Sequence, residues 1–452
     1  MRNRTVVSSP EATTMIKPIF SFLASAAVLL AGSVNAADFA IRDGDRVVFL
    51  GDSITEQRLY TTYIEAYALT RHPDWKLTFR NVGWGGDTSW LRQRAHPDEA
   101  KLFAANEATQ QQMVEDSVKK GLERDVLPLK PTFITIKFGM NDHSYQAFRP
   151  DIFAAYTRSQ AQLNKVLSDK GARVTFLTPQ PIEDKRPDPD KDIRNQSLRK
   201  FSDGLKDVAA KGGAGFVDMF DPYMGLMLSA RTTNPQAIIG GGDAVHPGPA
   251  GQTLMAWAVL KGLNASALVS RVNVDAAKGT VDTEHCRVSG LKTHADEVSF
   301  DRLDTALPFP TDERAEPALK LAPVVDELSQ YSLRVTGLAA GNYEVSIDGE
   351  AVLKTDADAL AKGVNLSNNA GPITKQAREV LALVFQKNNT FFRRWREVQL
   401  FNFPSWAKSP AVEATRASEL KRLDEEVAAT EAKINHARKP KSHKFTIKPA
   451  SK

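Results

Sequence analysis

Two short segments far apart in the chain carry side chains that together could hydrolyse an ester. Ser53 stands three residues after the apolar run 47–50, within Gly51-Asp52-Ser53-Ile54, and His246 stands three residues after Asp243. A serine hydroxyl is a weak nucleophile at neutral pH, so it needs a base within hydrogen-bond reach and a group that orients this base. Taken singly, Ser53 could equally be a helix N-cap, and Asp243 with His246 a structural pair or half of a metal site. Together they favour a nucleophile and its base.

Two further segments could donate hydrogen bonds to an oxyanion. One is Asn81-Val82-Gly83-Trp84-Gly85-Gly86-Asp87-Thr88, and the other is Gly139-Met140-Asn141-Asp142. A glycine lets a backbone N–H approach a reacting carbonyl closely, and an asparagine side chain donates from its amide. The N–H of Ser53, at the start of a predicted helix, would be a third donor.

These segments follow apolar runs that predict a parallel sheet. Between about residues 43 and 262, short apolar runs alternate with longer amphipathic stretches, which is typical of an α/β fold. Several runs are continuously apolar, as burial on both faces requires. Ligands bind beyond the carboxyl ends of such strands, where the four segments stand. The predicted strands are 46–50, 76–82, 132–138, 173–178 and 215–218, and the predicted helices are 59–70, 112–126, 151–168, 195–211 and 250–260.

In this order the four segments resemble the blocks of the GDSL/SGNH hydrolase family, named for its Ser, Gly, Asn and His. The first block matches Gly51-Asp52-Ser53, with Ile54 where the name-giving motif has Leu, and the others match residues 81–88, 139–142 and 243–246. The resemblance covers about half of the chain. It is specific for fold and catalytic apparatus, and not for substrate.

The resemblance implies an α/β fold, a three-layer αβα flavodoxin-like domain with a five-stranded parallel sheet. It also implies a serine esterase that works through an acyl-enzyme. Ser53 would be the nucleophile, His246 the base and Asp243 the orienting acid. The oxyanion hole would consist of Ser53 N–H, Gly86 N–H and the Asn141 side chain, with the neighbouring Gly85 as the alternative to Gly86. No cofactor and no metal are expected, because the chain has no H-E-x-x-H motif and no phosphate-binding glycine loop.

The remaining chain predicts a small β-sandwich accessory region and C-terminal helices. Strands are predicted at 332–336, 342–347 and 351–355, with a two-residue turn at Asp348-Gly349, and less distinctly at 269–274 and 298–302. Helices are predicted at 374–387 and 417–437; an apolar stripe on the second could pack on its own domain or on another copy. The predicted division is a signal peptide at 1–36, a hydrolase domain at 37–263, a β-rich accessory domain at 264–370, a helical return segment at 371–410, and a polar helix with a basic tail at 411–452.

The amino-terminal segment predicts export to the periplasm or the medium. Lys17 precedes an apolar run at 19–34, and Val34-Asn35-Ala36 suits cleavage after Ala36. The run is shorter than the roughly 20 residues that a membrane span needs, so no stable span is expected after cleavage. The net charge of +5 lies largely in this segment and the C-terminal tail. We therefore expect no nucleic-acid partner, which would need a basic face on the folded body.

Export and a β-sandwich favour a carbohydrate as the substrate, most simply through removal of O-acetyl groups. The alternative within the same class is a lipase or a general short-chain esterase, and from another class a noncatalytic extracellular carbohydrate-binding protein. His143 is a candidate for lining the pocket. Arg394 and Trp395 lie in a stretch, residues 387–404, that is similar to one in secreted multidomain bacterial members of the family. They could bind an acidic or sugar substrate, or simply pack on a surface helix.

Overall fold

The central sheet of the computed structural model has five parallel strands in the order β2-β1-β3-β4-β5. The structure describes residues 38–294 and 296–450, so the predicted signal peptide lies outside the described residues. The strands are β1 (Arg46–Gly51), β2 (Thr78–Asn81), β3 (Phe133–Lys137), β4 (Arg173–Leu177) and β5 (Gly215–Val217).

Helices cover both faces of this sheet. Val47 and Phe49 of β1 enter one core, with α2, α8 and α9, whereas Val48 and Leu50 enter a second core, with α5, α6 and α7. Side chains along a strand alternate between the two faces of the sheet, so a continuously apolar strand is buried on both faces. The predicted three-layer α/β fold is therefore confirmed. The helices are α1 (Ser53–Glu56), α2 (Leu59–Arg71), α3 (Arg92–Ala95), α4 (Glu99–Ala104), α5 (Glu107–Asp125), η1 (Leu127–Leu129), α6 (Pro150–Asp169), α7 (Ile193–Gly212), α8 (Phe220–Thr233) and α9 (Pro249–Gly262).

The accessory region consists of two further sheets, in the orders β13-β10-β6-β7 and β12-β11-β14-β9-β8. The pairings are antiparallel except between β6 and β10, which run parallel. The predicted turn joins β11 to β12, and both Asp348 (φ 51°) and Gly349 (φ 81°) have the positive φ of a type I′ turn. The strands are β6 (Leu268–Asp275), β7 (Thr280–Glu284), β8 (Cys286–Thr293), β9 (Val298–Asp304), β10 (Gln330–Thr336), β11 (Asn342–Ile347), β12 (Glu350–Asp356) and β13 (Val364–Asn365), and the helices are η2 (Glu313–Ala315), α10 (Glu316–Leu321), α11 (Val324–Leu328) and α12 (Ala357–Lys362).

The prediction of a basic tail at the C-terminus is wrong for residues 442–449, which form strand β14 (Ser442–Pro449). This strand lies between β11 and β9, in the middle of its sheet. Phe445 and Ile447 are fully buried, whereas the lysines of the segment point to the other side. The alternation of apolar and basic residues therefore marks a strand with one buried face.

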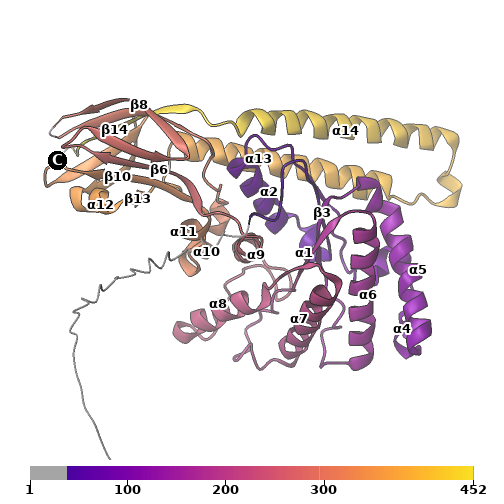
Figure 1. The fold of residues 1–452 in the computed structure, drawn as a ribbon. Coiled ribbons are helices and arrows are strands. Elements are labelled where there is room, and N and C mark those ends of the chain that lie inside the picture. Colours follow the sequence, from indigo (N-terminus) through magenta and orange to yellow (C-terminus); the bar gives the residue numbers. More distant parts are fainter. Residues whose placement is uncertain (1–37, 295, 451–452) are drawn as a thin grey trace, which may run out of the picture. The chain divides into compact units, whose positions relative to one another are not determined.

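Two antiparallel helices, α13 (Pro372–Phe392) and α14 (Pro410–Ala437), form what we call the C-terminal helical hairpin (Figure 1). The π-helical segment η3 (Arg393–Gln399) and the turn η4 (Ser405–Ala407) connect them. Helix α13 packs on α2 and on β2, the edge strand of the central sheet. Buried Lys387 donates to the carbonyl of Phe79 in β2, 3.2 Å away, and pairs with Glu65 of α2. The hairpin thereby covers a sheet edge that would otherwise expose unpaired backbone groups.

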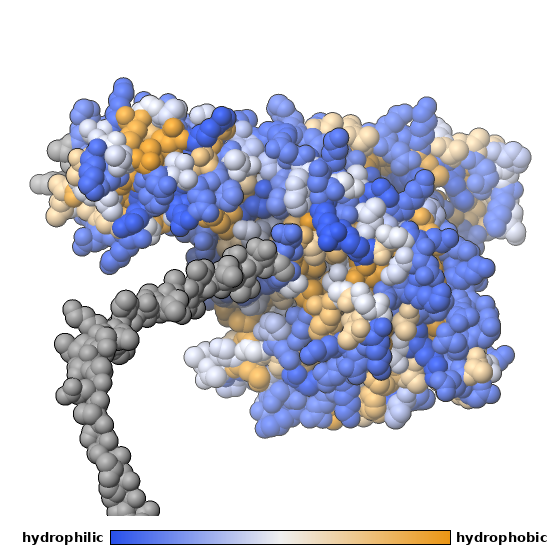
Figure 2. Space-filling view, viewed as in Figure 1, coloured by the Kyte–Doolittle hydropathy of each residue, from blue (hydrophilic) through white to orange (hydrophobic). Residues whose placement is uncertain are grey.

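The apolar stripe of α14 packs within the chain itself. Leu423, Val427 and Ile434 are buried, so of the two predicted alternatives the structure favours packing on the same chain over pairing with another copy. The visible surfaces of α5, α6 and α7 are mainly hydrophilic (Figure 2). Within residues 38–294 and 296–450, no helix combines the length and apolarity needed to cross a membrane.

Candidate active site

Ser53 begins helix α1, and its hydroxyl is directed at His246. The N-cap of α1 is Asp52, whose carboxylate accepts the N–H of Ile54 at 3.0 Å. The capping role that the sequence left open for Ser53 is thus taken by its neighbour. Ser53 Oγ lies 2.8 Å from Nε2 of His246, across a sequence separation of 193 residues. A nucleophile and a base are therefore within direct proton-transfer distance.

Asp243 holds the other nitrogen of the imidazole. Its Oδ2 lies 3.0 Å from Nδ1 of His246, and its Oδ1 accepts the backbone N–H groups of Val245 and His246 at 2.8 and 2.7 Å. Partial burial alone would raise the pKa of Asp243, but the hydrogen bonds from these two backbone amides and the imidazole outweigh it and lower the pKa. The carboxylate stays ionised at neutral pH, as an orienting group for His246 must.

The loop that carries His246 is fixed by two glutamines from elsewhere in the fold. Gln180, after β4, donates to the carbonyl of Val245 at 2.9 Å. Gln252, in α9, donates to the carbonyl of Pro247 at 3.1 Å and accepts the N–H of Tyr60 at 3.0 Å. Because Tyr60 lies in α2, shortly after the nucleophile helix, Gln252 connects the two parts of the chain whose side chains must meet.

The loop after β2 distinguishes Gly86 from Gly85 as an oxyanion donor. The N–H of Gly85 is bonded to Oε2 of Glu56 at 2.9 Å, so it is engaged. The N–H of Gly86 has no partner among the described residues, while its carbonyl accepts from Arg92 at 2.6 and 3.1 Å. Gly86 has a φ of 75°, and an added Cβ would lie 3.0 Å from Nε2 in the side chain of Gln93. Both its conformation and its surroundings therefore favour glycine.

The Asn141 side chain is oriented by two hydrogen bonds. Its Nδ2 donates to the carbonyl of Asp87, next to Gly86, at 2.9 Å, and its Oδ1 accepts from the hydroxyl of Tyr145 at 2.9 Å. The first bond uses one of the two amide hydrogens, and the other remains for an oxyanion. Asn141 is thus bonded to the backbone of the residue that follows Gly86.

A buried ion pair lies directly behind the nucleophile. Lys137, the last residue of β3, places Nζ 3.2 and 3.3 Å from the two carboxylate oxygens of Asp52, and both side chains are 0% exposed. Burial lowers the pKa of Lys137, and the charge of Asp52 opposes this shift. The predicted site does not include this pair, although a single lysine within the apolar run 132–138 indicates a buried charge that needs a partner.

Asp142 connects two of the loops. Its carboxylate accepts the N–H of Ser89 at 2.8 Å and that of Gly139 at 3.0 Å, and the side chain is fully buried. Burial raises the pKa of Asp142 to about 6, although both backbone amides lower it. These bonds fix the loop after β2 relative to the loop that carries Asn141.

His143 is packed rather than open to solvent. It is 2% exposed, its Nδ1 lies 3.2 Å from the carbonyl of Gly139, and its ring contacts those of Tyr145 and Phe201. Burial lowers the pKa of His143 to about 4, so it is neutral near pH 7. Its contact with the site is indirect: its ring packs on Tyr145, whose hydroxyl donates to Asn141.

Arg394 and Trp395, predicted as possible substrate-binding residues, make their contacts within the protein. Arg394 is bonded to Asp424 of α14 at 2.8 Å. Trp395 is 1% exposed and lies edge-on to Trp84, with 5.9 Å between ring centroids. A buried indole cannot stack on a sugar, so these contacts do not support that role. Trp395 attaches the hairpin to the loop after β2, whereas the bond of Arg394 lies within the hairpin.

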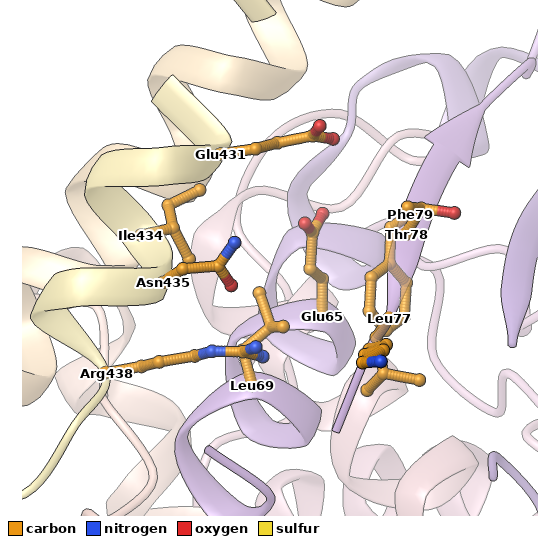
Figure 3. A pocket seen from close by; sticks show the side chains of 10 residues that line it. Glu65, Leu69, Leu77, Thr78, Phe79, Glu431, Ile434, Asn435 and Arg438 are labelled. Atoms are coloured by element: carbon orange, nitrogen blue, oxygen red, sulfur yellow. The ribbon is translucent and has the colours of Figure 1, made fainter. Parts of the chain in front are cut away.

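A cavity of about 290 Å³ lies away from these residues, between α2, β2 and α14 (Figure 3). Its carboxylates are already paired, Glu65 with Lys387 and Glu431 with Arg80, each at 2.7 Å. It contains none of the predicted site residues, and we assign no chemistry to it.

Known proteins resemble this chain in sequence and in fold. Residues 49–254 match the model of the GDSL-like lipase/acylhydrolase family. An acetylxylan esterase from Geobacillus stearothermophilus is 27% identical over 232 residues, which cover 49% of this chain and 94% of that protein. The solved structure of a gut microbial diltiazem-metabolizing enzyme is 23% identical, with a TM-score of 0.75, over 91% of this chain and 98% of that one. This last likeness concerns the fold, and it extends over most of the chain.

Proposed function

We propose that the chain, which matches the GDSL-like lipase/acylhydrolase family over residues 49–254, is an ester-hydrolysing serine hydrolase that removes acyl groups, chiefly O-acetyl groups, from a carbohydrate. The observation that carries the catalytic part is the chain of hydrogen bonds from Ser53 through His246 to Asp243, with spacings of 2.8 and 3.0 Å. The acetylxylan esterase relative supports the carbohydrate part.

In the proposed acylation, Ser53 Oγ attacks the ester carbonyl carbon while its proton passes to Nε2 of His246. Asp243 keeps a proton on Nδ1, which leaves the lone pair of Nε2 directed at Ser53, and then stabilises the imidazolium. The imidazolium returns its proton to the oxygen of the leaving alcohol as the ester C–O bond breaks. An acyl-enzyme on Ser53 and a free sugar hydroxyl result.

In the proposed deacylation, a water molecule attacks the acyl carbon and gives a proton to Nε2 of His246. The bond between this carbon and Ser53 Oγ breaks, the serine recovers the proton, and the carboxylic acid leaves. In both steps the carbonyl oxygen carries negative charge. The N–H groups of Ser53 and Gly86 and the Asn141 amide would stabilise that charge, because preorganised donors cost no reorganisation during the reaction.

The first test measures hydrolysis of p-nitrophenyl acetate by the wild type and by Ser53→Ala. We expect kcat/KM to fall at least about 1000-fold in the variant, because it has lost its nucleophile. Hydrolysis that does not depend on Ser53, or none by the wild type, would contradict the catalytic proposal and favour the noncatalytic carbohydrate-binding alternative.

The second test separates the ester substrates. Acetate release is measured from acetylated xylan and pectin, in parallel with fatty-acid release from emulsified triglycerides and with short-chain alkyl esters. The proposal predicts the highest kcat/KM on an acetylated glycan. A preference for triglycerides or simple alkyl esters would instead support the lipase or general esterase alternative.

We also propose that the protein is exported. The motivation is the apolar run 19–34 after Lys17, with small residues at the expected cleavage position. Amino-terminal sequencing of the protein from the periplasm and the medium should find a chain that begins at residue 37. An uncleaved chain confined to the cytosolic fraction would contradict export.

A further inference from the structure

Arg396 of the C-terminal helical hairpin contacts the part of the hydrolase domain that carries the candidate oxyanion donors. This residue lies in η3, and its guanidinium carbon is 3.8 Å from the centroid of the Trp84 ring. Its Nε is 3.6 Å from Oε1 of Glu56. Trp84 belongs to the loop after β2 and Glu56 ends helix α1, so one cation touches both the loop with Gly86 and the helix that begins with Ser53.

Glu56 connects Arg396 to the backbone of the loop after β2. Its Oε2 accepts the N–H of Gly85 at 2.9 Å, while Oε1 faces Arg396. A Cβ on Gly85 would lie 2.8 Å from the same Oε2, so the loop approaches the carboxylate as closely as a glycine permits. The peptide that contains the Gly86 N–H directly follows the one that Glu56 holds. A change in the position of this carboxylate would therefore turn the Gly86 N–H.

Trp84 supplies a second attachment. Its backbone N–H donates to the carbonyl of Gly51 at 2.9 Å, immediately before Asp52 and Ser53 in the chain. Trp84 is only 7% exposed. Its ring is contacted by Arg396 at 3.8 Å, by Arg124 at 4.7 Å and by the edge of Trp395. The hairpin residues thus contribute much of the packing around this indole.

The hairpin also holds the end of α1 at a separate point. Arg58, with a left-handed backbone conformation (φ 60°), stacks on Phe392 at 4.0 Å and donates to Asn389 at 3.2 Å. Its Nη1 bonds the backbone carbonyl of Glu56 at 2.6 Å, which leaves the Glu56 carboxylate to Gly85 and Arg396. No other cation is within 4.0 Å of that carboxylate among the described residues.

From these contacts we propose that Arg396 is a positioning residue for the oxyanion hole, acting through Glu56 and Trp84 on the Gly86 N–H. The hairpin, which lies outside the family match at 49–254, would therefore be part of the catalytic apparatus. This inference rests on the proposed function. It assigns to the hairpin a role in transition-state stabilisation, because an oxyanion donor acts mainly after the carbonyl oxygen becomes charged.

The test uses Arg396→Met, which keeps apolar contact with Trp84 and removes the charge. With p-nitrophenyl acetate we expect kcat to fall between about 10-fold and 100-fold and KM to change little, since a displaced donor costs less than a lost one. Arg396→Lys, which restores a cation near Glu56, should recover part of kcat. The matched control is Arg393→Met in the same segment, because Arg393 pairs with Glu419 of α14 at 3.3 Å. It should keep the wild-type kcat.

A double-mutant cycle with Glu56→Gln tests the route. If Arg396 acts through Glu56, the double variant should lose no more kcat than the more damaged single variant. Strictly multiplicative losses, or a wild-type kcat in a folded Arg396→Met protein, would overturn the inference, and so would an equal loss in Arg393→Met. Failure of the proposed function would give a different result. The wild type and Ser53→Ala would then hydrolyse p-nitrophenyl acetate equally fast, or neither would hydrolyse it.

Discussion

Replacing Lys137 by Met should destabilise the protein strongly, because it leaves Asp52 buried without its cation. Lys137 Nζ lies 3.2 and 3.3 Å from the two carboxylate oxygens, and neither side chain is exposed. Besides Lys137, the carboxylate has one hydrogen bond from a described residue, the N–H of Ile54 at 3.0 Å. Breaking one partner of such a pair costs about 3–5 kcal/mol. One retained hydrogen bond cannot replace a neutralising charge.

The loss of unfolding free energy in Lys137→Met should appear as a lower melting temperature, Tm. For a folding unit of about 400 residues, an unfolding entropy of about 2.1 cal/mol/K per residue corresponds to about 1 °C per kcal/mol, so a loss of about 3–5 kcal/mol lowers Tm by about 3–6 °C. The assay is thermal and urea unfolding of the wild type and variant, followed by circular dichroism at a fixed protein concentration. The control is Lys165→Met, because Lys165 is 67% exposed in its pair with Asp169. It should change stability by less than about 0.5 kcal/mol.

The double variant Lys137→Met, Asp52→Asn separates an unpaired charge from a packing defect. Asn is a good N-cap and carries no charge, so the double variant should be more stable than Lys137→Met alone. If Lys137→Met unfolds like the wild type, the reasoning about this pair is refuted. If the double variant is as unstable as the single one, packing and not charge explains the loss.

Three further predictions concern the site itself. Asn141→Ala should lower kcat by about 100-fold, equivalent to about 3 kcal/mol of transition-state stabilisation, and a folded variant with normal turnover would count against an oxyanion role. Asp243→Asn should lower kcat on p-nitrophenyl acetate by less than the about 10⁴-fold seen for a buried triad aspartate. The Asp243 side chain is 67% exposed, so water can partly replace its interaction with His246. The lowered pKa of His143, about 4 against the usual 6.5, means that the unfolded chain binds the proton first, so unfolding free energy should fall as the pH drops from 6.5 to 4. His143→Phe should remove up to about 3 kcal/mol of that pH dependence, measured by urea unfolding at each pH, and an unchanged profile would contradict the burial argument.

The central sheet and the meeting of Ser53 with His246 could be predicted because both follow from local patterns. Continuous apolar runs identify strands that are buried on both faces, and parallel strands bring their carboxyl ends to one edge. Residues far apart in sequence then meet without further information. Helix α8 is absent from the predicted helices although its buried residues Phe220, Tyr223, Met224 and Met227 have helical spacing; that signal was present and unused.

Strand β14 and the hairpin contacts depended on long-range partners. A lysine-rich segment at the end of a chain resembles a solvated tail in composition, and only the alternation of Phe445 and Ile447 with polar residues indicates a strand. Its place between β9 and β11 could not be derived, because nothing local specifies which strands a terminal segment joins. The same holds for Arg396, whose partner Glu56 lies 340 residues earlier.

Residue chemistry alone does not identify the cap of helix α1 or the glycine that serves as oxyanion donor. In each case two adjacent residues could fill the role equally well. Asp52 and Ser53 both cap helices well, and Gly85 and Gly86 both lack a Cβ. In each case a hydrogen bond decides. Asp52 takes the cap and frees the Ser53 hydroxyl, and Glu56 occupies the Gly85 N–H and leaves that of Gly86 unpartnered among the described residues. The acids that decide both choices flank the nucleophile, so the segment from residue 52 to 56 supplies the reacting hydroxyl and also sets which neighbouring amide can serve it.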